Sequence, residues 1–275
     1  MTATERRNPF LISAVLVLLL FSFCFSQVTS QLQFHSKLGT QFYNSYSQLT
    51  LQVPMKIGYP AFRALSIFIE IGASFSLLKA DNSISFFFTS SGLSSDDGLE
   101  KNLVLTDQSS LLQTSLTDHL LWQLFDWKGF RGSAGGASEL QFHYRKLVYP
   151  SSMKERTIDF DLGLGPDLML QYQKQQMEIG TSVTSLFYLP YFNYGNLKKQ
   201  SGNQIISYSS YYAFYYRTLI DFHLGYSISR NKKVTLGITQ DNIVGFADRK
   251  RKFFNEDLIH YRLDRTYRLY LGYSL

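Results

Sequence analysis

The chain has 275 residues, of which 17% are charged and 16% aromatic, with 19 tyrosines and 23 phenylalanines. This composition is too apolar for a disordered protein, and a single domain of this length is common among β-barrels. The formal net charge is +6. Acidic and basic residues are nevertheless interleaved and no long basic helix is expected, so we predict no binding of nucleic acid.

The N-terminal segment has the pattern of a secretory signal peptide. Arg6 and Arg7 form a positively charged region, and residues 10–25 form a nearly continuous apolar run. That run is short for a membrane-spanning helix, which needs about 20 residues. We predict that residues 1–26 are the signal peptide, with cleavage after residue 30 or an uncleaved anchor as alternatives.

The mature chain, residues 27–275, is expected to contain no thiol, because Cys24 is the only cysteine. It can then form neither a disulfide nor a cysteine-ligated metal site. None of the five histidines has the spacing that is typical of metal ligands. We therefore predict no metal and no cofactor.

Apolar and polar residues alternate along much of the mature chain, which predicts strands with one apolar and one polar face. In the segment 63–78, for example, Ile67 and Ile69 alternate with Ser66 and Glu70. We predict an all-β fold, an antiparallel transmembrane β-barrel of eight strands. The predicted strands are 32–43, 47–59, 63–78, 156–172, 177–192, 208–228, 233–245 and 265–275.

Residues 79–155 are predicted to be a long extracellular insertion in this barrel. Four leucines within it recur at helical spacing and predict a short helix. They are Leu112, Leu116, Leu120 and Leu124. The flanking segments 84–88 and 140–144 could pair as a hairpin. If that hairpin joined the wall, the barrel would have ten strands and the helix would lie in the periplasm.

Three features favour a membrane barrel over a soluble sandwich. Several predicted strands are longer than the roughly 5–6 residues usual in globular proteins, and glycines and charges keep to one face. Aromatic residues also gather near strand ends, as in the interfacial girdles of outer-membrane barrels. These aromatic residues are Phe187, Tyr188, Tyr191, Phe192, Tyr194, Tyr211 and Tyr212. Because every backbone polar group must be paired in lipid, the strands are expected to close into a barrel.

The connections predict how the barrel lies in a bacterial outer membrane. Short turns at 173–176 and 230–233 are expected in the periplasm, and longer loops at 193–207 and 246–264 are expected outside the cell. The last strand, 265–275, is expected to be recognised by the barrel-assembly machinery. Outer-membrane lipid and lipopolysaccharide are the other expected partners, together with an envelope protein.

Charged residues on the predicted inward face form the main candidate site. They are Lys56, Glu70, Asp159, Asp161, Asp167, Glu178, Arg217, Asp221, His223, Asp241 and Arg268. Buried charges must pair, so we expect an internal network that plugs the lumen, with Asp159 and Asp161 meeting Arg217 or Arg268. A narrow polar path through the lumen is the alternative.

Two other groups of residues are candidate sites. Ser138, Glu139 and His143 are the only residues that loosely resemble the parts of an outer-membrane hydrolase, and no nucleophile or phosphate-loop motif is present. We therefore predict no enzyme, with a lipid-modifying enzyme as an alternative. A basic run faces outward in the predicted topology, where it would meet lipopolysaccharide phosphates or an anionic partner. Its members are Arg249, Lys250, Arg251 and Lys252.

Several strands resemble a known family. Residues 51–59 and 68–73, together with 159–165, are similar to strands of the Bacteroidota outer-membrane β-barrel family that includes PorT-like proteins, and 270–275 resembles its closing strand. The resemblance implies the barrel fold and a place in the outer membrane, and it hardly constrains the activity. From the sequence we expect a non-enzymatic protein of structural or interaction type, with a small channel as an alternative.

Overall fold

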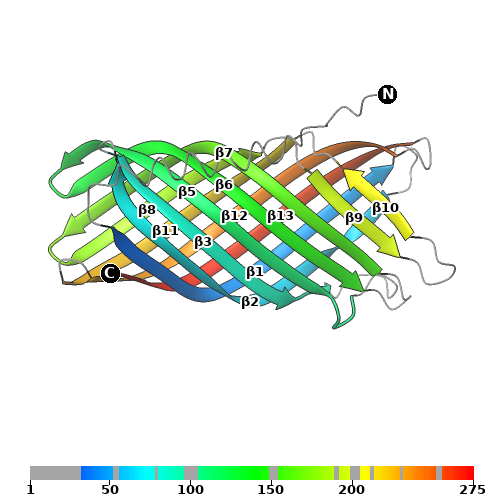
Figure 1. Cartoon of the computed structure of the whole chain (residues 1–275), viewed down its shortest axis with the longest axis horizontal. Helices are drawn as coiled ribbons and strands as arrows, with labels where there is room; N and C mark the ends of the chain where they lie inside the picture. Colours follow the sequence, from blue (N-terminus) through cyan, green and yellow to red (C-terminus); the bar gives the residue numbers. More distant parts are fainter. Residues whose placement is uncertain are drawn as a thin grey trace, which may run out of the picture.

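A computed structural model shows a closed antiparallel barrel of ten wall strands (Figure 1). It describes residues 32–51, 56–77, 80–95, 105–148, 154–188, 192–198, 205–210, 214–229, 232–251 and 256–275. Side chains are described for these residues except 46–51, 56–61, 77, 154–155, 157, 159, 192–198, 205–210, 214–215, 246–251 and 256–262. The signal-peptide prediction lies outside the described residues.

The wall is built from consecutive hairpins, and β1 pairs with both β2 and β13 to close it. The strands are β1 (Gln33–Leu51), β2 (Lys56–Leu77), β3 (Ala80–Gly92), β4 (Ser94–Ser95), β5 (Ser110–Trp127), β6 (Phe130–Val148), β7 (Lys154–Lys174), β8 (Met177–Tyr188), β9 (Phe192–Lys198), β10 (Ile205–Ser210), β11 (Phe214–Ser229), β12 (Lys232–Arg251) and β13 (Glu256–Ser274). Strands β8 and β9 pair with successive parts of β7, so together they fill one wall position. The two-residue β4 pairs with β2 and is not a wall strand.

The two ends of the barrel differ. At one end, which we call the turn end, consecutive strands are joined by two-residue connections. Lys128 and Gly129 form one of these turns and Gln175 lies in another, and all three have positive φ, as tight hairpin turns require. The chain also enters and leaves the barrel here, where Phe34 and Leu275 exchange backbone hydrogen bonds of 3.1 and 2.8 Å. The predicted topology places this end in the periplasm.

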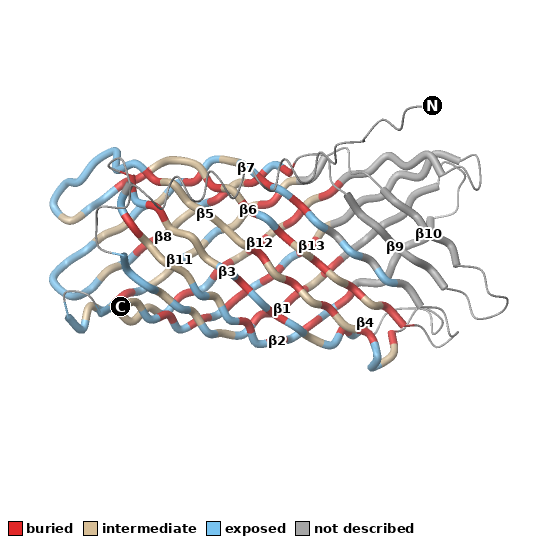
Figure 2. The backbone as a smooth tube through the Cα atoms, in the orientation of Figure 1, coloured by how far each residue is buried: buried red, intermediate tan, exposed pale blue. Residues whose placement is uncertain are grey.

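Burial alternates along the strands, with exposed residues on the outside (Figure 2). On β2, Leu65, Ile67 and Ile69 are 75%, 66% and 50% exposed, whereas Ser66 and Phe68 between them are 7% and 1% exposed. Such an outer surface of bare aliphatic side chains is stable only against an apolar medium. Among the described residues, no helix is long and apolar enough to cross a membrane.

The strand count corrects the sequence prediction of eight. Three expected strands, 32–43, 47–59 and 63–78, are only two, because β1 and β2 each continue past the predicted break. The expected insertion supplies three wall strands, β3, β5 and β6. The expected helix at 112–124 is wrong, since these residues belong to β5 and no helix occurs in the described part of the chain. Residues four apart share a face of a strand as well as of a helix, so the leucine spacing fits both.

The connections at the other end, the loop end, are also shorter than predicted. The expected loop 246–264 is mostly strand, since β12 runs to Arg251 and β13 starts at Glu256. Likewise, β9 and β10 occupy much of the expected loop 193–207. The wall is therefore longer at this end than the sequence predicts.

An apolar cluster fills part of the lumen toward the loop end. Its buried members come from β1, β2, β5, β6 and the segment before β5, and they are Tyr43, Phe62, Ala64, Leu93, Leu105, Leu111 and Leu147. The segment is held by β4 and by a backbone hydrogen bond of 3.0 Å from Leu93 to Ser109. The polar interior of the barrel therefore lies between this cluster and the turn end.

Candidate functional site

A buried ion-pair network lies across the middle of the lumen. Arg217 of β11 donates two hydrogen bonds to Asp241 of the neighbouring strand β12, at 2.8 and 2.7 Å. Arg217 also contacts Glu139 of β6, on the far side of β7 and β8. Arg268 of β13 donates to the same Asp241 at 2.9 Å. We call these four residues the central network.

Neutral side chains extend the central network to the remaining wall. Arg268 also donates to Gln41 of β1 at 2.9 Å, and Gln41 donates to Gln113 of β5 at 2.9 Å, across β2 and β3. The Gln113 amide lies 3.4 Å from a ring nitrogen of His143 on β6. Tyr188 donates to the Glu139 carboxylate at 2.6 Å. The contacts therefore cross the lumen twice, between β6 and β11 and between β1 and β5.

Burial explains why these charges come as a balanced set. The side chains of Arg217, Glu139 and Asp241 are only 2–3% exposed. An unpaired ion at such a position would cost several kcal/mol, so two guanidinium groups are matched by two carboxylates. The Arg268 guanidinium also lies 4.5 Å from the ring centre of Phe87, a cation–π contact.

A second charged cluster lies on the turn-end side of the central network. The His223 ring lies between Asp221, at 3.1 Å, and Glu178, at 3.3 Å. Lys233 donates to Glu178 at 2.8 Å, and the Tyr270 hydroxyl lies 3.0 Å from both oxygens of Asp221. Four strands, β8, β11, β12 and β13, are thereby connected on the lumen side.

Two lumen glycines make room for these rings. Gly180 is the direct cross-strand partner of His223, and Gly237 that of Tyr270. In each pair the ring occupies the space where a Cβ atom of the glycine would stand. The same relation holds for Gly163 and Tyr188 on β7 and β8. Glycines in these strands thus let large polar rings lie flat against the wall.

Two further pairs of polar side chains lie on the turn-end side of the central network. Lys37 and Glu70 form an ion pair of 2.9 Å, half-open to solvent. A ring nitrogen of His119 lies 2.7 Å from Asp167, whose other oxygen accepts a 2.8 Å hydrogen bond from Thr184. Both pairs join side chains from different strands, so they brace the wall as well as neutralising charge.

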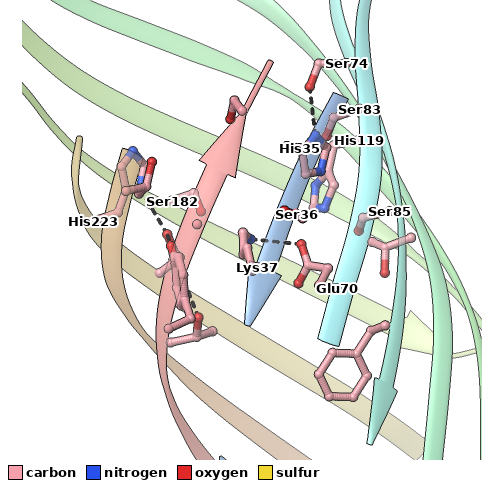
Figure 3. Close-up of a pocket in the computed structure, with 18 of the residues that line it drawn as sticks. His35, Ser36, Lys37, Glu70, Ser74, Ser83, Ser85, His119, Ser182 and His223 are labelled. Atoms are coloured by element: carbon pink, nitrogen blue, oxygen red, sulfur yellow. Dashed lines mark hydrogen bonds and ion pairs between the residues drawn. The ribbon is translucent and has the colours of Figure 1, made fainter. Parts of the chain in front are cut away.

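These groups surround a cavity of about 450 Å³, which we call the vestibule (Figure 3). Arg217, Glu139 and Arg268 line it on the side of the central network, and the exposed Gln33 and Lys232 line it at the turn end. The lining contains many hydroxyl groups, which Figure 3 shows around the ion pairs. The serines and threonines among them are Ser36, Ser74, Ser83, Ser85, Ser115, Thr117, Ser182, Thr184, Ser227, Ser229, Thr235, Thr239 and Ser274. The vestibule is therefore a cavity lined by many polar side chains and bounded on one side by the central network.

The structure distributes the predicted lumen residues over these groups. The predicted residues that it places in the contacts above are Glu70, Asp167, Glu178, Arg217, Asp221, His223, Asp241 and Arg268. Asp161 is buried, but the expected pairing with Arg217 or Arg268 is wrong, because the described partners of these arginines are Glu139, Asp241 and Gln41. The side chains of Lys56 and Asp159 lie outside the described residues.

Several members of the site were missed by the sequence reasoning. The sequence pattern does not place Glu139, Gln41 and Gln113 in the lumen, because it predicts an insertion where β5 and β6 lie and because β1 alternates poorly. Tyr188 was expected in a lipid-facing girdle, yet it points inward to Glu139. The alternation of Glu139, Gln141 and His143 along β6 was the signal that could have found this face.

The loosely proposed hydrolase group does not assemble. Glu139 and His143 are buried in the lumen, whereas Ser138 lies on the opposite face of β6. Among residues with described side chains, no group of three or more His, Cys, Asp or Glu is arranged to hold a metal ion. In the predicted basic run, the backbone of residues 249–251 forms the end of β12. Lys252 and the side chains of all four basic residues lie outside the described residues.

Comparison with solved structures places this geometry among known folds. The outer membrane protease OmpT from Escherichia coli aligns with 88% of this chain and 95% of its own, with a TM-score of 0.54 and 13% identity. The fold is that of an outer-membrane β-barrel. Two other solved structures are more distant. One is the translocator domain of the autotransporter NalP from Neisseria meningitidis, with 8% identity over 99% of each chain and a TM-score of 0.43. The other is OprG from Pseudomonas aeruginosa, with 11% identity over 90% of this chain and 98% of that chain and a TM-score of 0.36.

Comparisons of the sequence alone identify no relative among protein families or curated proteins. No protein-family profile matches the chain. No curated protein matches it in sequence. The barrel fold, with its apolar outer belt, is consistent with a place in the bacterial outer membrane.

Proposed function

We propose that this protein is a non-enzymatic, non-conducting outer-membrane barrel of structural or interaction type. The observation that carries the proposal is the central network, in which Arg217 reaches across the lumen to Glu139. The buried, paired side chains that cross the lumen support a barrel without a continuous water path at that level. Because each charge there is already neutralised, the network also offers no free group to a passing solute.

Conductance in planar bilayers tests the closed lumen. The mature protein is expected to show no steady current, and the double variant Arg217→Ala/Arg268→Ala is expected to conduct, because it removes both guanidinium groups from the constriction. A matched control is Lys37→Ala, which breaks an ion pair in the vestibule wall and should leave the barrel closed. Steady ohmic current through the unaltered protein would overturn the proposal in favour of a small channel, the alternative that the polar vestibule favours.

Catalysis is the other alternative, in the form of a lipid-modifying enzyme. Against it stands the arrangement on β6, where Ser138 and His143 lie on opposite faces. The protease activity named for OmpT stays with that protein, because 13% identity speaks for the fold alone. A phospholipid hydrolysis assay that detects turnover in the unaltered protein but not in His143→Ala would revive this alternative.

A closed barrel acts through what its two ends contact. We propose that this protein is an accessory of secretion or envelope assembly, with an envelope protein as partner. Lipopolysaccharide at the basic run 249–252 and the barrel-assembly machinery at β13 are further proposed partners. Cross-linking in intact cells, followed by identification of the captured envelope proteins, tests this; capture of the assembly machinery alone would contradict a role after insertion.

A further inference from the structure

The hairpin of β5 and β6 extends past its neighbour at the turn end. Strand β3 pairs with β5 only as far as Trp122, opposite Ala80, while β5 continues to Trp127 and pairs there with β6 alone. Nearly every residue from Trp122 to Arg131 is exposed, as the tip of this hairpin shows in Figure 2. The hairpin therefore projects beyond the barrel rim on the side of β3.

A β-bulge decides which side chains the projecting hairpin turns outward. Gln123 lies opposite the buried, lumen-facing Ser133, but Phe125 lies opposite Gly132, so Leu124 is an extra residue without a partner. Because cross-strand partners share a face, the extra residue returns Phe125 to the outer face. Without the bulge, simple alternation would turn Phe125 toward the lumen side.

The outer face of the hairpin is consequently aromatic. Trp122, Phe125, Trp127 and Phe130 are 45%, 48%, 64% and 49% exposed. The Phe125 ring lies against Gly132, and the Phe130 ring packs on Tyr172 of β7 with 4.4 Å between ring centres. We call these four exposed residues the aromatic face.

The opposite face of the hairpin is polar. Asp126 and Arg131 are cross-strand partners there and form an ion pair of 3.5 Å. At the tip, the Lys128 amine lies 5.1 Å from the ring centre of Trp127. The hairpin is thus amphipathic across its thickness, with a cation at its end.

The aromatic face continues the lipid-facing belt of the barrel. Phe130 lies opposite Tyr172 of β7, and Gly132, the partner of Phe125, lies opposite the 56% exposed Leu170, which belongs to that belt. The edge of β5 past Trp122 has no strand partner among the described residues, and unpaired backbone is not tolerated in hydrocarbon. Aromatic rings with a free backbone edge and a nearby cation fit the headgroup region, where water reaches the backbone and phosphates are present.

We propose that the β5–β6 hairpin is a membrane-surface anchor, in which the aromatic face lies among the phospholipid headgroups of the periplasmic leaflet and Lys128 contacts a lipid phosphate. Trp122 lies nearer the hydrocarbon and Trp127 nearer the water.

The chain suits a direct test, because its two tryptophans both lie on this hairpin. The mature protein is folded into phosphatidylcholine vesicles whose acyl chains carry bromine near the headgroup or deep in the chain, which quench nearby tryptophan. Trp122→Phe leaves Trp127 as the reporter, and Trp127→Phe leaves Trp122. Both reporters are expected to lose emission in brominated vesicles, with Trp127 more sensitive to shallow bromine and Trp122 to deep bromine.

A third reporter controls for the face. Gln123→Trp in the Trp122→Phe/Trp127→Phe background places the only tryptophan on the lumen side, where bromine should leave the emission unchanged and aqueous acrylamide should quench it. The proposal is overturned if Trp127 behaves like this control, since its face would then meet water or a periplasmic protein. It is also overturned if all three reporters are quenched equally by bromine.

The role of Lys128 has its own comparison. In vesicles containing anionic phosphatidylglycerol, Lys128→Gln is expected to shift the Trp127 emission to longer wavelength. Without the contact between the amine and a lipid phosphate, the Trp127 ring should lie less deeply among the headgroups and meet more water. Lys146→Gln, on β6 near the loop end, is the matched control and should leave the emission unchanged. Equal emission from both variants would remove the phosphate contact from the proposal.

Discussion

Replacing Arg217 by methionine removes the only cation that the described structure gives to Glu139. The guanidinium donates to Asp241 at 2.8 and 2.7 Å and also contacts Glu139. After the replacement, Asp241 keeps Arg268 at 2.9 Å, but Glu139 keeps only the hydroxyl groups of Tyr188 and Thr117. Because Glu139 is 2% exposed, the cost should approach the roughly 3–5 kcal/mol typical of breaking a buried ion pair.

A double-mutant cycle separates the stranded carboxylate from lost packing. Glu139→Gln combined with Arg217→Met removes both charges and leaves Asp241 paired with Arg268. The double variant should then cost less than the sum of the single variants by about 1–3 kcal/mol, the range for coupled neighbours. The free energy of unfolding is obtained from urea titrations of the folded protein in vesicles, with the heat-modifiable shift on gels as the measure of folding.

Two results would refute this reasoning. If Arg217→Met lowers the free energy of unfolding by less than about 1 kcal/mol, the buried pair is not what the geometry indicates. If the two single variants add to within about 0.5 kcal/mol, Arg217 and Glu139 do not interact energetically, whatever their separation.

Three further predictions concern other parts of the wall. Gly237→Val should displace the Tyr270 ring from Asp221 and lower the free energy of unfolding by about 1–3 kcal/mol, whereas Gly272→Ala, which meets only ordinary contacts, should not; equal urea midpoints would count against the glycine–ring pairs. Lys37→Met breaks a pair that is 31% and 18% exposed, so its cost should stay near or below about 1 kcal/mol and shrink in high salt; a cost like that of Arg217→Met would contradict this ranking. Asp118 lies opposite Ile84 on the outer face, so Asp118→Leu should stabilise the barrel in vesicles by about 1 kcal/mol, and a loss of stability there would show that the carboxylate has a partner.

Strand faces could be predicted from the sequence wherever both faces keep a strict code. On β7 and β11, apolar residues such as Leu168 and Phe222 alternate with Asp167 and Asp221, and the structure puts the apolar residues outside and both carboxylates in the lumen. Strand number was harder, because β5 places Leu112, Leu116 and Leu120 on its outer face with Thr114 and Asp118 between them. The polar residues broke the alternation, and the remaining leucines matched a helical period equally well.

The partners within the lumen could not be predicted, for a different reason. Which acid meets Arg217 depends on the register and on how far a side chain reaches across the barrel. Asp161 and Glu139 both point inward from neighbouring strands, two positions apart in register, because Asp161 lies opposite Gln141. Only the placement of β6 in the wall brings Glu139 rather than Asp161 to the guanidinium, and that placement required the strand count.

The sequence therefore constrains the lipid-facing and the lumen-facing positions of this barrel to different degrees. Alternation determines which face meets lipid and tolerates substitution among apolar residues, since hydrocarbon does not distinguish leucine from isoleucine. The lumen code is specific, because each buried ion needs one partner and each large ring needs one glycine. A single inserted residue, as at Leu124, can exchange the two faces of all that follows on its strand, and in the β5–β6 hairpin it returns the aromatic residues to the side that the membrane covers.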